Sequence, residues 1–146
     1  MGRGELAALE VEKWAKTPFH PQQAARGQGV DCKGLVYGVA RDLGFPEAES
    51  FYATFIAYDL AKKGGVPHKL LREGLDDLFD RAEDIRPGDV LLLKLGILPG
   101  HLAIASRNEG RAWHAQLAPN DYVKEASLRS LLKMFPLVAA YRWRTL

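Results

Sequence analysis

The sequence predicts an α+β fold, with helices in the first half of the chain and a mostly antiparallel sheet in the second. In the first half, apolar residues recur at helical spacing. From residue 86 onward, short apolar runs alternate with turn residues, which is typical of strands. The 146 residues suffice for one hydrophobic core and contain no internal repeat, so we expect a single domain spanning residues 1–146.

The first element is a helix over residues 4–16, where Leu6, Leu9 and Trp14 stand near helical spacing. Residues 17–30 hold two prolines and two glycines and therefore predict a loop.

A second helix begins at Asp31 or Cys32. Asp31 can cap it by accepting hydrogen bonds from free backbone N–H groups, and Gly44 followed by Pro46 ends it. One continuous apolar face runs along this helix and consists of Cys32, Leu35, Val36, Val39, Ala40 and Leu43.

Two segments follow: residues 47–63, which predict a helix or an irregular segment, and residues 68–80, which predict a helix. The turn RPGD then introduces the sheet, and a hairpin turn at residues 108–110 joins its second and third strands. A helix over residues 126–135 precedes the last strand. The expected strands cover residues 90–95, 100–106, 111–117 and 137–144.

Composition excludes several classes of function. The chain has 20 Lys and Arg against 18 Asp and Glu, and they are scattered, so we expect no nucleic-acid binding. No apolar run approaches the roughly 20 residues of a membrane span. The first twenty residues lack the apolar core of a signal peptide, so we expect synthesis in the cytoplasm without a signal peptide.

Cys32 is the only cysteine. Helical periodicity alone fits a buried core residue as well as a nucleophile. However, its place in the first turn of a helix favours negative charge on sulfur, and the free N–H groups there can receive an oxyanion.

Two of the four histidines can complete a catalytic site around this cysteine. His101 and His114 lie on adjacent predicted strands, so the two rings can be neighbours on one face, with His101 as base and His114 orienting it. His20 and His68 are expected at a surface loop and a helix start. One cysteine and two histidines could also hold zinc, but no short paired-ligand motif is present, and we expect neither a metal nor a cofactor.

Four segments in order, GVDCKGLVYGVARDLG, RPGDVLLL, GHLAIA and RAWHAQ, resemble the NlpC family of papain-like cell-wall peptidases, and its phage-encoded branch in particular. The resemblance spans nearly the whole chain. It implies a papain-like fold and hydrolysis of amide bonds in peptidoglycan stem peptides, often γ-D-glutamyl bonds to a diamino acid.

By this resemblance Cys32 is the nucleophile, His101 the general base and His114 the residue that orients the base. Asp31 matches the family's acidic residue before the cysteine and supports the helix start.

Two positions depart from the family pattern. Phe19 stands where many members have a tyrosine whose hydroxyl helps to bind the oxyanion, and Lys33 stands where serine is usual. A neighbouring ammonium favours the thiolate, so Lys33 is compatible with catalysis.

Three functions remain open from the sequence. The leading one is a cysteine endopeptidase that cleaves stem peptides, associated with a phage tail or released to the cell wall. Phe19 is the best support for the second, a non-catalytic module for tail assembly or wall binding that contacts other phage tail proteins. The third is a papain-like amidase or acyltransferase. In each case residues 17–30 and 47–67 are expected to form much of the cleft.

Overall fold

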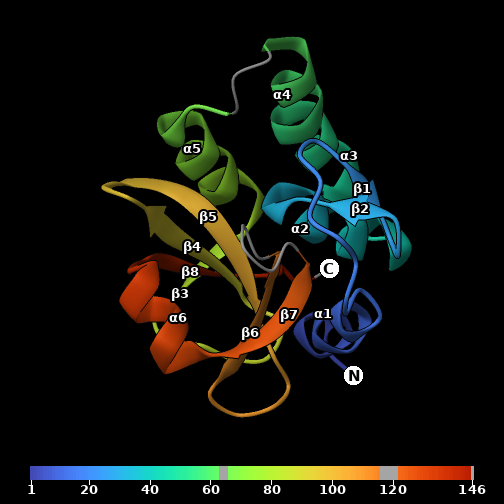
Figure 1. Cartoon of the computed structure of the whole chain (residues 1–146). Helices are drawn as coiled ribbons and strands as arrows, with labels where there is room; N and C mark the ends of the chain where they lie inside the picture. Colours follow the sequence, from blue (N-terminus) through green and yellow to red (C-terminus); the bar gives the residue numbers. More distant parts are fainter. Residues whose placement is uncertain (63–65, 116–121, 146) are drawn as a thin grey trace.

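The computed structural model describes residues 1–62, 66–115 and 122–145, and has the predicted α+β architecture (Figure 1). The first half is mainly helical, apart from a small hairpin between the first two helices. Its elements are α1 (Arg3–Glu12), β1 (Ala24–Ala25), β2 (Gly29–Val30), α2 (Cys32–Asp42), α3 (Glu47–Phe51), the π-helical turn η1 (Tyr52–Ile56), α4 (Ala57–Lys62) and α5 (His68–Leu78).

The second half forms a six-stranded sheet in the order β3-β8-β4-β5-β6-β7, in which every neighbouring pair is antiparallel. One helix, α6, interrupts the run of strands. The elements are β3 (Asp80–Ala82), β4 (Val90–Leu95), β5 (Leu98–Ala105), β6 (Arg111–Ala115), β7 (Val123–Ser127), α6 (Leu128–Met134) and β8 (Leu137–Arg142).

The sheet has an apolar core on each face, and the residues of β4 contribute to both cores. Val90 and Leu92 belong to the main core with α1, α2 and α5, whereas Leu91 and Leu93 pack in a smaller core that includes Leu131 of α6. Because successive side chains of a strand point to opposite faces, a strand covered on both sides is apolar at every position. The run VLLL is therefore the sequence of a central strand.

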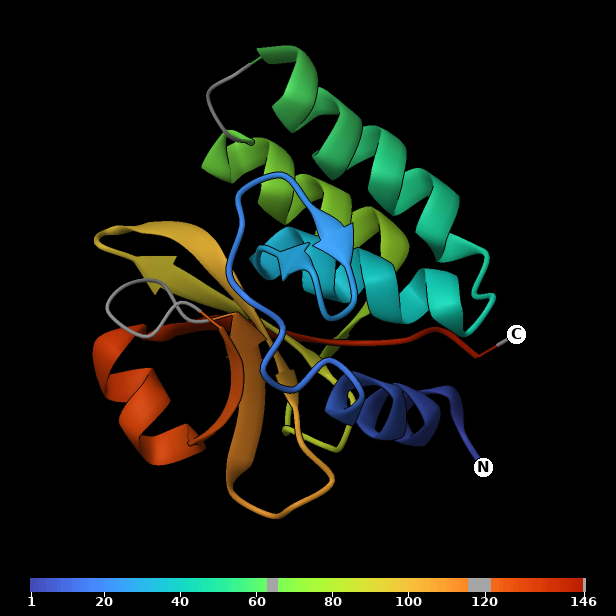
Figure 2. The same ribbon diagram turned by 45° about the vertical axis from the view of Figure 1, so that its right-hand side comes forward.

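Helix α2 lies at the centre of the helical layer, and two of its glycines permit close approach by other segments. A Cβ at Gly38 would lie 2.3 Å from the Trp14 ring, and one at Gly34 would lie 2.1 Å from the carbonyl oxygen of Gln23. Figure 2 shows the loop that contains β1 and β2 lying over α2. Gly34 thus lets this loop lie against the start of α2, and Gly38 makes room for the Trp14 ring.

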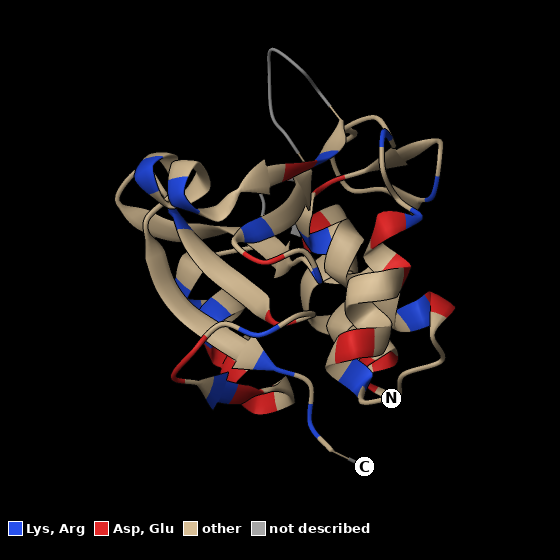
Figure 3. Cartoon of the chain, turned by 90° about the horizontal axis from the view of Figure 1, so that it is seen from below, with Lys and Arg blue, Asp and Glu red and all other residues tan. Residues whose placement is uncertain are grey.

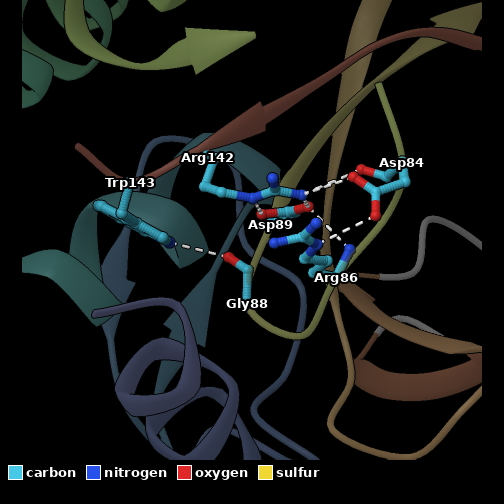
Figure 4. A network of polar contacts seen from close by, with 6 residues as sticks. All are labelled: Asp84, Arg86, Gly88, Asp89, Arg142 and Trp143. Carbon is cyan, nitrogen blue, oxygen red and sulfur yellow. Dashed lines mark hydrogen bonds and ion pairs between the residues drawn. The ribbon is translucent and has the colours of Figure 1, made fainter. Parts of the chain in front are cut away.

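The turn before β4 is fixed by a polar network (Figure 4). The buried Asp89 carboxylate accepts hydrogen bonds from the Arg142 guanidinium at 2.9 and 3.1 Å and from the backbone N–H of Arg86 at 2.8 Å. Trp143 Nε1 donates to the carbonyl oxygen of Gly88 at 2.8 Å. These bonds join the RPGD turn to the end of β8.

Along the ribbon seen from below, Lys and Arg positions are interspersed with Asp and Glu positions, as the scattered charges of the sequence predict (Figure 3). No helix among the described residues is long and apolar enough to span a membrane.

Most of the predicted elements are confirmed, including the start of α2 at Cys32 and its end before Gly44, which has a φ of 71°. Residues 47–62 are helical throughout. Among the described residues four strands were missed. The two-residue strands β1 and β2 pair within the predicted loop of residues 17–30, β3 has three residues and pairs with β8, and β7 pairs with β6. The predicted helix over residues 126–135 was too long, because Ala126 and Ser127 belong to β7.

Candidate active site

Cys32 is the first residue of α2, and Asp31 is the N-cap. One Asp31 carboxylate oxygen accepts the N–H of Gly34 at 2.7 Å, and the other accepts the N–H of Gln22 at 2.8 Å. The first bond satisfies a free N–H group of the helix start, and the second holds the loop of residues 17–30 to it. Asp31 is thus the helix cap that the sequence predicts.

The hairpin of β5 and β6 brings His101 and His114 together. His101 Nε2 lies 3.0 Å from His114 Nδ1, and the two residues are only 3% and 1% exposed. Phe135, which follows α6, packs against the pair, with its ring centre 4.6 Å from that of His101 and 6.3 Å from that of His114. The bond to His114 uses Nε2, so Nδ1 is the nitrogen of His101 that remains for a proton transfer.

Cys32 and His101 line the same pocket, which has a volume of about 270 Å³. The Cys32 thiol lies 4.0 Å from the carbonyl oxygen of Gly100, the residue before His101. The sheet supplies one wall and the loop before α2 supplies the other. The remaining lining residues are Phe19, Pro21, Gln22, Asp31, Lys33, Asp59 and Leu95.

Burial dominates the electrostatics of the thiol. It raises the pKa of Cys32, and nearby Asp31 acts in the same direction, whereas the Lys33 ammonium and backbone hydrogen bonds from Leu102 and Lys33 lower it by less. Burial therefore opposes the helix start, which favours negative charge on sulfur, and the net effect is a raised pKa. Lys33 does favour the thiolate, as its charge predicts.

The two histidines are neutral at ordinary pH. Burial lowers the pKa of His101 to about 3, with smaller contributions from His114 and Lys33. Burial also lowers the pKa of His114 to about 4, and Lys124 adds to this. A neutral His101 that donates from Nε2 to His114 has a free lone pair on Nδ1, which is the form that a general base requires.

Sequence reasoning missed three residues of the site. Asp59 of α4 forms an ion pair with Lys33 at 3.7 Å. Gln22 has a φ of 62° and donates from its amide to the Asp59 carbonyl oxygen at 3.4 Å. Phe135 packs against the two histidines. No motif marks Asp59 or Phe135, because each reaches the site only through the packing of a distant element.

The two remaining histidines lie away from the pocket. His20 and His68 are exposed, as predicted, and do not line the pocket. Among the described residues, no group of three or more His, Cys, Asp or Glu side chains is placed to hold a metal ion. Phe19 is half-buried and lines the pocket, and from the described residues of the 47–67 segment Asp59 lines it too.

No protein-family model matches the sequence, and no curated protein matches it. Solved structures do match the fold. NlpC1 from Trichomonas vaginalis has a TM-score of 0.68 and 18% identity, with 100% of this chain and 46% of that chain covered. NlpC2 from the same organism has a TM-score of 0.69 and 17% identity, with coverage of 99% and 49%.

The NlpC/p60 domain of the peptidoglycan hydrolase SagA has a TM-score of 0.63 and 20% identity, with 97% of this chain and 99% of that domain covered. The chain spans about half the length of the two Trichomonas vaginalis proteins. At these identities the comparisons establish architecture. The chain has the papain-like α+β fold of NlpC/p60 domains.

Proposed function

We propose that the protein is a cysteine peptidase that hydrolyses amide bonds in peptidoglycan stem peptides, with γ-D-glutamyl bonds to a diamino acid as the preferred target. One observation carries the proposal. A lone thiol at the start of a helix shares a pocket with a histidine whose far nitrogen is held by a second buried histidine. This is the arrangement that thiol acyl transfer needs.

In the proposed reaction, His101 Nδ1 takes the proton of the Cys32 thiol as the sulfur attacks the scissile carbonyl. The carbonyl oxygen becomes an oxyanion at the start of α2, where helical backbone N–H groups lack an intrahelical acceptor. His101 then gives its proton to the leaving amine, and a thioester on Cys32 remains. A water molecule, deprotonated by His101, hydrolyses the thioester and restores the thiol.

Within this scheme His114 keeps the base in its productive form. When His101 is protonated, its Nε2–H still donates to His114 Nδ1, so the positive charge forms against an acceptor 3.0 Å away. Because burial raises the pKa of Cys32 and lowers that of His101, the resting pair is neutral and proton transfer accompanies attack. Substrate binding excludes water from the pocket and holds the carbonyl beside sulfur.

Peptidoglycan as the substrate is supported by the four sequence segments that resemble the NlpC family and by the fold of SagA, which is described as a peptidoglycan hydrolase. The resemblance to phage-encoded members supports association with a phage tail. Detection of the chain in purified virions would test that association, and its absence from virions that infect normally would contradict it.

Digestion of purified sacculi, followed by mass spectrometry of the released fragments, tests the proposed activity. We expect wild-type protein to release fragments that end at a γ-D-glutamyl group, and Cys32→Ala and His101→Ala to release none. His20→Ala is the matched control and should digest normally, since His20 is exposed. Equal digestion by Cys32→Ala would contradict the proposal. Fragments joined to an added amine would instead indicate an acyltransferase.

Phe19 favours a second candidate function, a wall-binding or tail-assembly module that does not cleave. Phe19 lines the pocket without a hydroxyl to offer the oxyanion. A protein of this kind would bind sacculi without releasing fragments. The intact set of Cys32, His101 and His114 favours the enzyme.

A further inference from the structure

Two charged side chains stand beside the thiol without a part in the acyl transfer itself. Lys33 follows Cys32 in α2, and Asp59 projects from α4; both line the 270 Å³ pocket. Their side chains are 15% and 5% exposed. A substrate that brings a carbonyl to Cys32 therefore meets this pair as well.

The ion pair of Lys33 and Asp59 leaves hydrogen-bonding groups without partners among the described residues. Lys33 Nζ lies 3.7 Å from Asp59 Oδ2, beyond the roughly 2.7–2.9 Å of a charge-assisted hydrogen bond. Asp59 Oδ1 is buried and accepts no hydrogen bond within the part of the chain that the structure describes. A buried ion pair offsets its desolvation only when its remaining lone pairs and protons are also satisfied. Lys33 can therefore donate to a further acceptor, and Asp59 can accept from a further donor.

The surroundings keep both groups in place and Lys33 charged. Burial by itself would lower the pKa of Lys33, but Cys32 when ionised and the carboxylates of Asp31 and Asp59 raise it above its ordinary value. Asp31 does not compete for the ammonium as a hydrogen-bond partner, because its two oxygens accept backbone N–H groups. Gln22 ties the backbone of Asp59 to the loop before α2.

The two charges limit what can bind between them. An anion is attracted by Lys33 and repelled by Asp59, and a cation meets the opposite forces. A group that carries a carboxylate and an ammonium satisfies both residues and supplies the donor that Asp59 Oδ1 lacks. Specificity then arises from the cost of leaving either buried charge with the wrong neighbour.

We infer that Lys33 and Asp59 form a subsite for a zwitterionic amino-acid group of the substrate, with its carboxylate on Lys33 and its ammonium on Asp59. The inference rests on the proposed function in taking a stem peptide as the source of that group. Stem peptides offer the chemistry in two places. One is the free end of a diaminopimelate side chain; the other is a free amino-terminal alanine beside the α-carboxylate of γ-linked glutamate.

Three peptides separate these sources by calorimetric binding to the Cys32→Ala chain, which cannot cleave them. The reference is acetyl-L-Ala-γ-D-Glu-L-Lys-amide, which has neither zwitterionic group. The second peptide is acetyl-L-Ala-γ-D-Glu-meso-diaminopimelate, and the third is the reference with a free amino terminus. We expect one of the latter two to bind at least about tenfold more tightly than the reference, and that peptide identifies the source.

Substitutions in the same background test the residues. Lys33→Met and Asp59→Asn should each remove the tenfold preference, and Lys69→Met, at an exposed lysine of α5, should keep it. Equal binding of all three peptides, or a preference that survives both pocket substitutions, overturns the inference. If a substituted chain fails to fold, as judged by circular dichroism, the peptide series alone still decides.

The peptide-binding experiment and the digestion of sacculi can fail independently of each other. Discrimination among the peptides by a protein that digests no sacculi would refute the proposed function and leave the subsite standing. Digestion of sacculi by a protein that binds the three peptides alike would refute the subsite alone.

Discussion

At the scale of single residues, Cys32 combines two environments that oppose each other. Its place at the start of α2 and beside Lys33 favours the thiolate, and its burial favours the thiol more strongly. The sequence predicts the first effect, because helix position and neighbours along the chain are local. It cannot predict the second, because burial depends on how β5 and the loop before α2 close over the sulfur.

The alkylation of Cys32 by iodoacetamide should therefore have a midpoint above the free-cysteine pKa of about 8.5. Lys33→Met should move this midpoint higher, since the ammonium lowers the pKa of the thiol. Rates measured against pH give the midpoint directly, because the chain has one cysteine. Lys69→Met is the control. A midpoint well below 8.5, or one that Lys33→Met leaves in place, would contradict this assignment.

Phe19 supplies a second prediction at this scale. Since it lines the pocket with Cys32, a hydroxyl added there can donate to the oxyanion. We expect Phe19→Tyr to raise kcat for stem-peptide cleavage about tenfold, because one such donor is commonly worth a factor of about 10²–10³ where it is fully aligned. Phe19→Leu, which adds no donor, is the control. An unchanged kcat in Phe19→Tyr would show that backbone donors alone serve the site.

At the scale of elements, the start of α2 depends on Asp31. Its carboxylate accepts one N–H group from the helix and one from the loop, so Asp31→Ala leaves both without their partner. We expect a loss of about 2 kcal/mol in the free energy of unfolding. Urea denaturation measures it.

Ser127→Ala is the matched control for that cap. Ser127 caps α6 through one exposed bond of 3.4 Å to the N–H of Ser130, so its loss should cost less, about 0.5 kcal/mol. Equal losses in the two variants would mean that the two bonds of Asp31 add nothing beyond an ordinary cap.

The elements also show where prediction from sequence succeeds. Helix α2 and the hairpin of β5 and β6 carry their own signals, namely a helical apolar face, a cap and a turn of three residues. The short strand β3 has no apolar alternation and exists because β8 passes beside it. The pairing of His101 with His114 could be predicted because the hairpin signal is local in the sequence. Asp59 and Phe135 could not be assigned to the site, because each reaches it only through the packing of a distant element.

At the scale of the whole molecule, the buried histidine pair links stability to pH. Each ring binds a proton less readily in the folded chain than in the unfolded chain, where the pKa is about 6.5. As pH falls below 6.5, the unfolded chain takes up protons that the folded chain excludes, down to about 4 for His114 and about 3 for His101. The contribution of the two neutral rings to stability is therefore fully present above about pH 6.5 and decreases as the pH falls toward the pKa values of the folded chain.

Urea denaturation at pH 7 and pH 5 tests this linkage. The free energy of unfolding should fall by roughly 1.4 kcal/mol per pH unit for each buried ring in that window. His114→Asn should show a smaller fall than the wild type, and His68→Asn, at an exposed position, should show the same fall. Equal pH dependence in His114→Asn and the wild type would place the acid sensitivity elsewhere.

The most direct test of catalysis by Cys32, His101 and His114 is the rate of hydrolysis of L-Ala-γ-D-Glu-meso-diaminopimelate by wild type, Cys32→Ala and His114→Asn, each confirmed as folded by circular dichroism. We predict measurable cleavage by wild type and none by Cys32→Ala. In His114→Asn we predict a kcat lowered at least about tenfold, because the His114 ring that accepts the Nε2–H of His101 and orients the base is lost. Cleavage by Cys32→Ala at the wild-type rate would contradict the account.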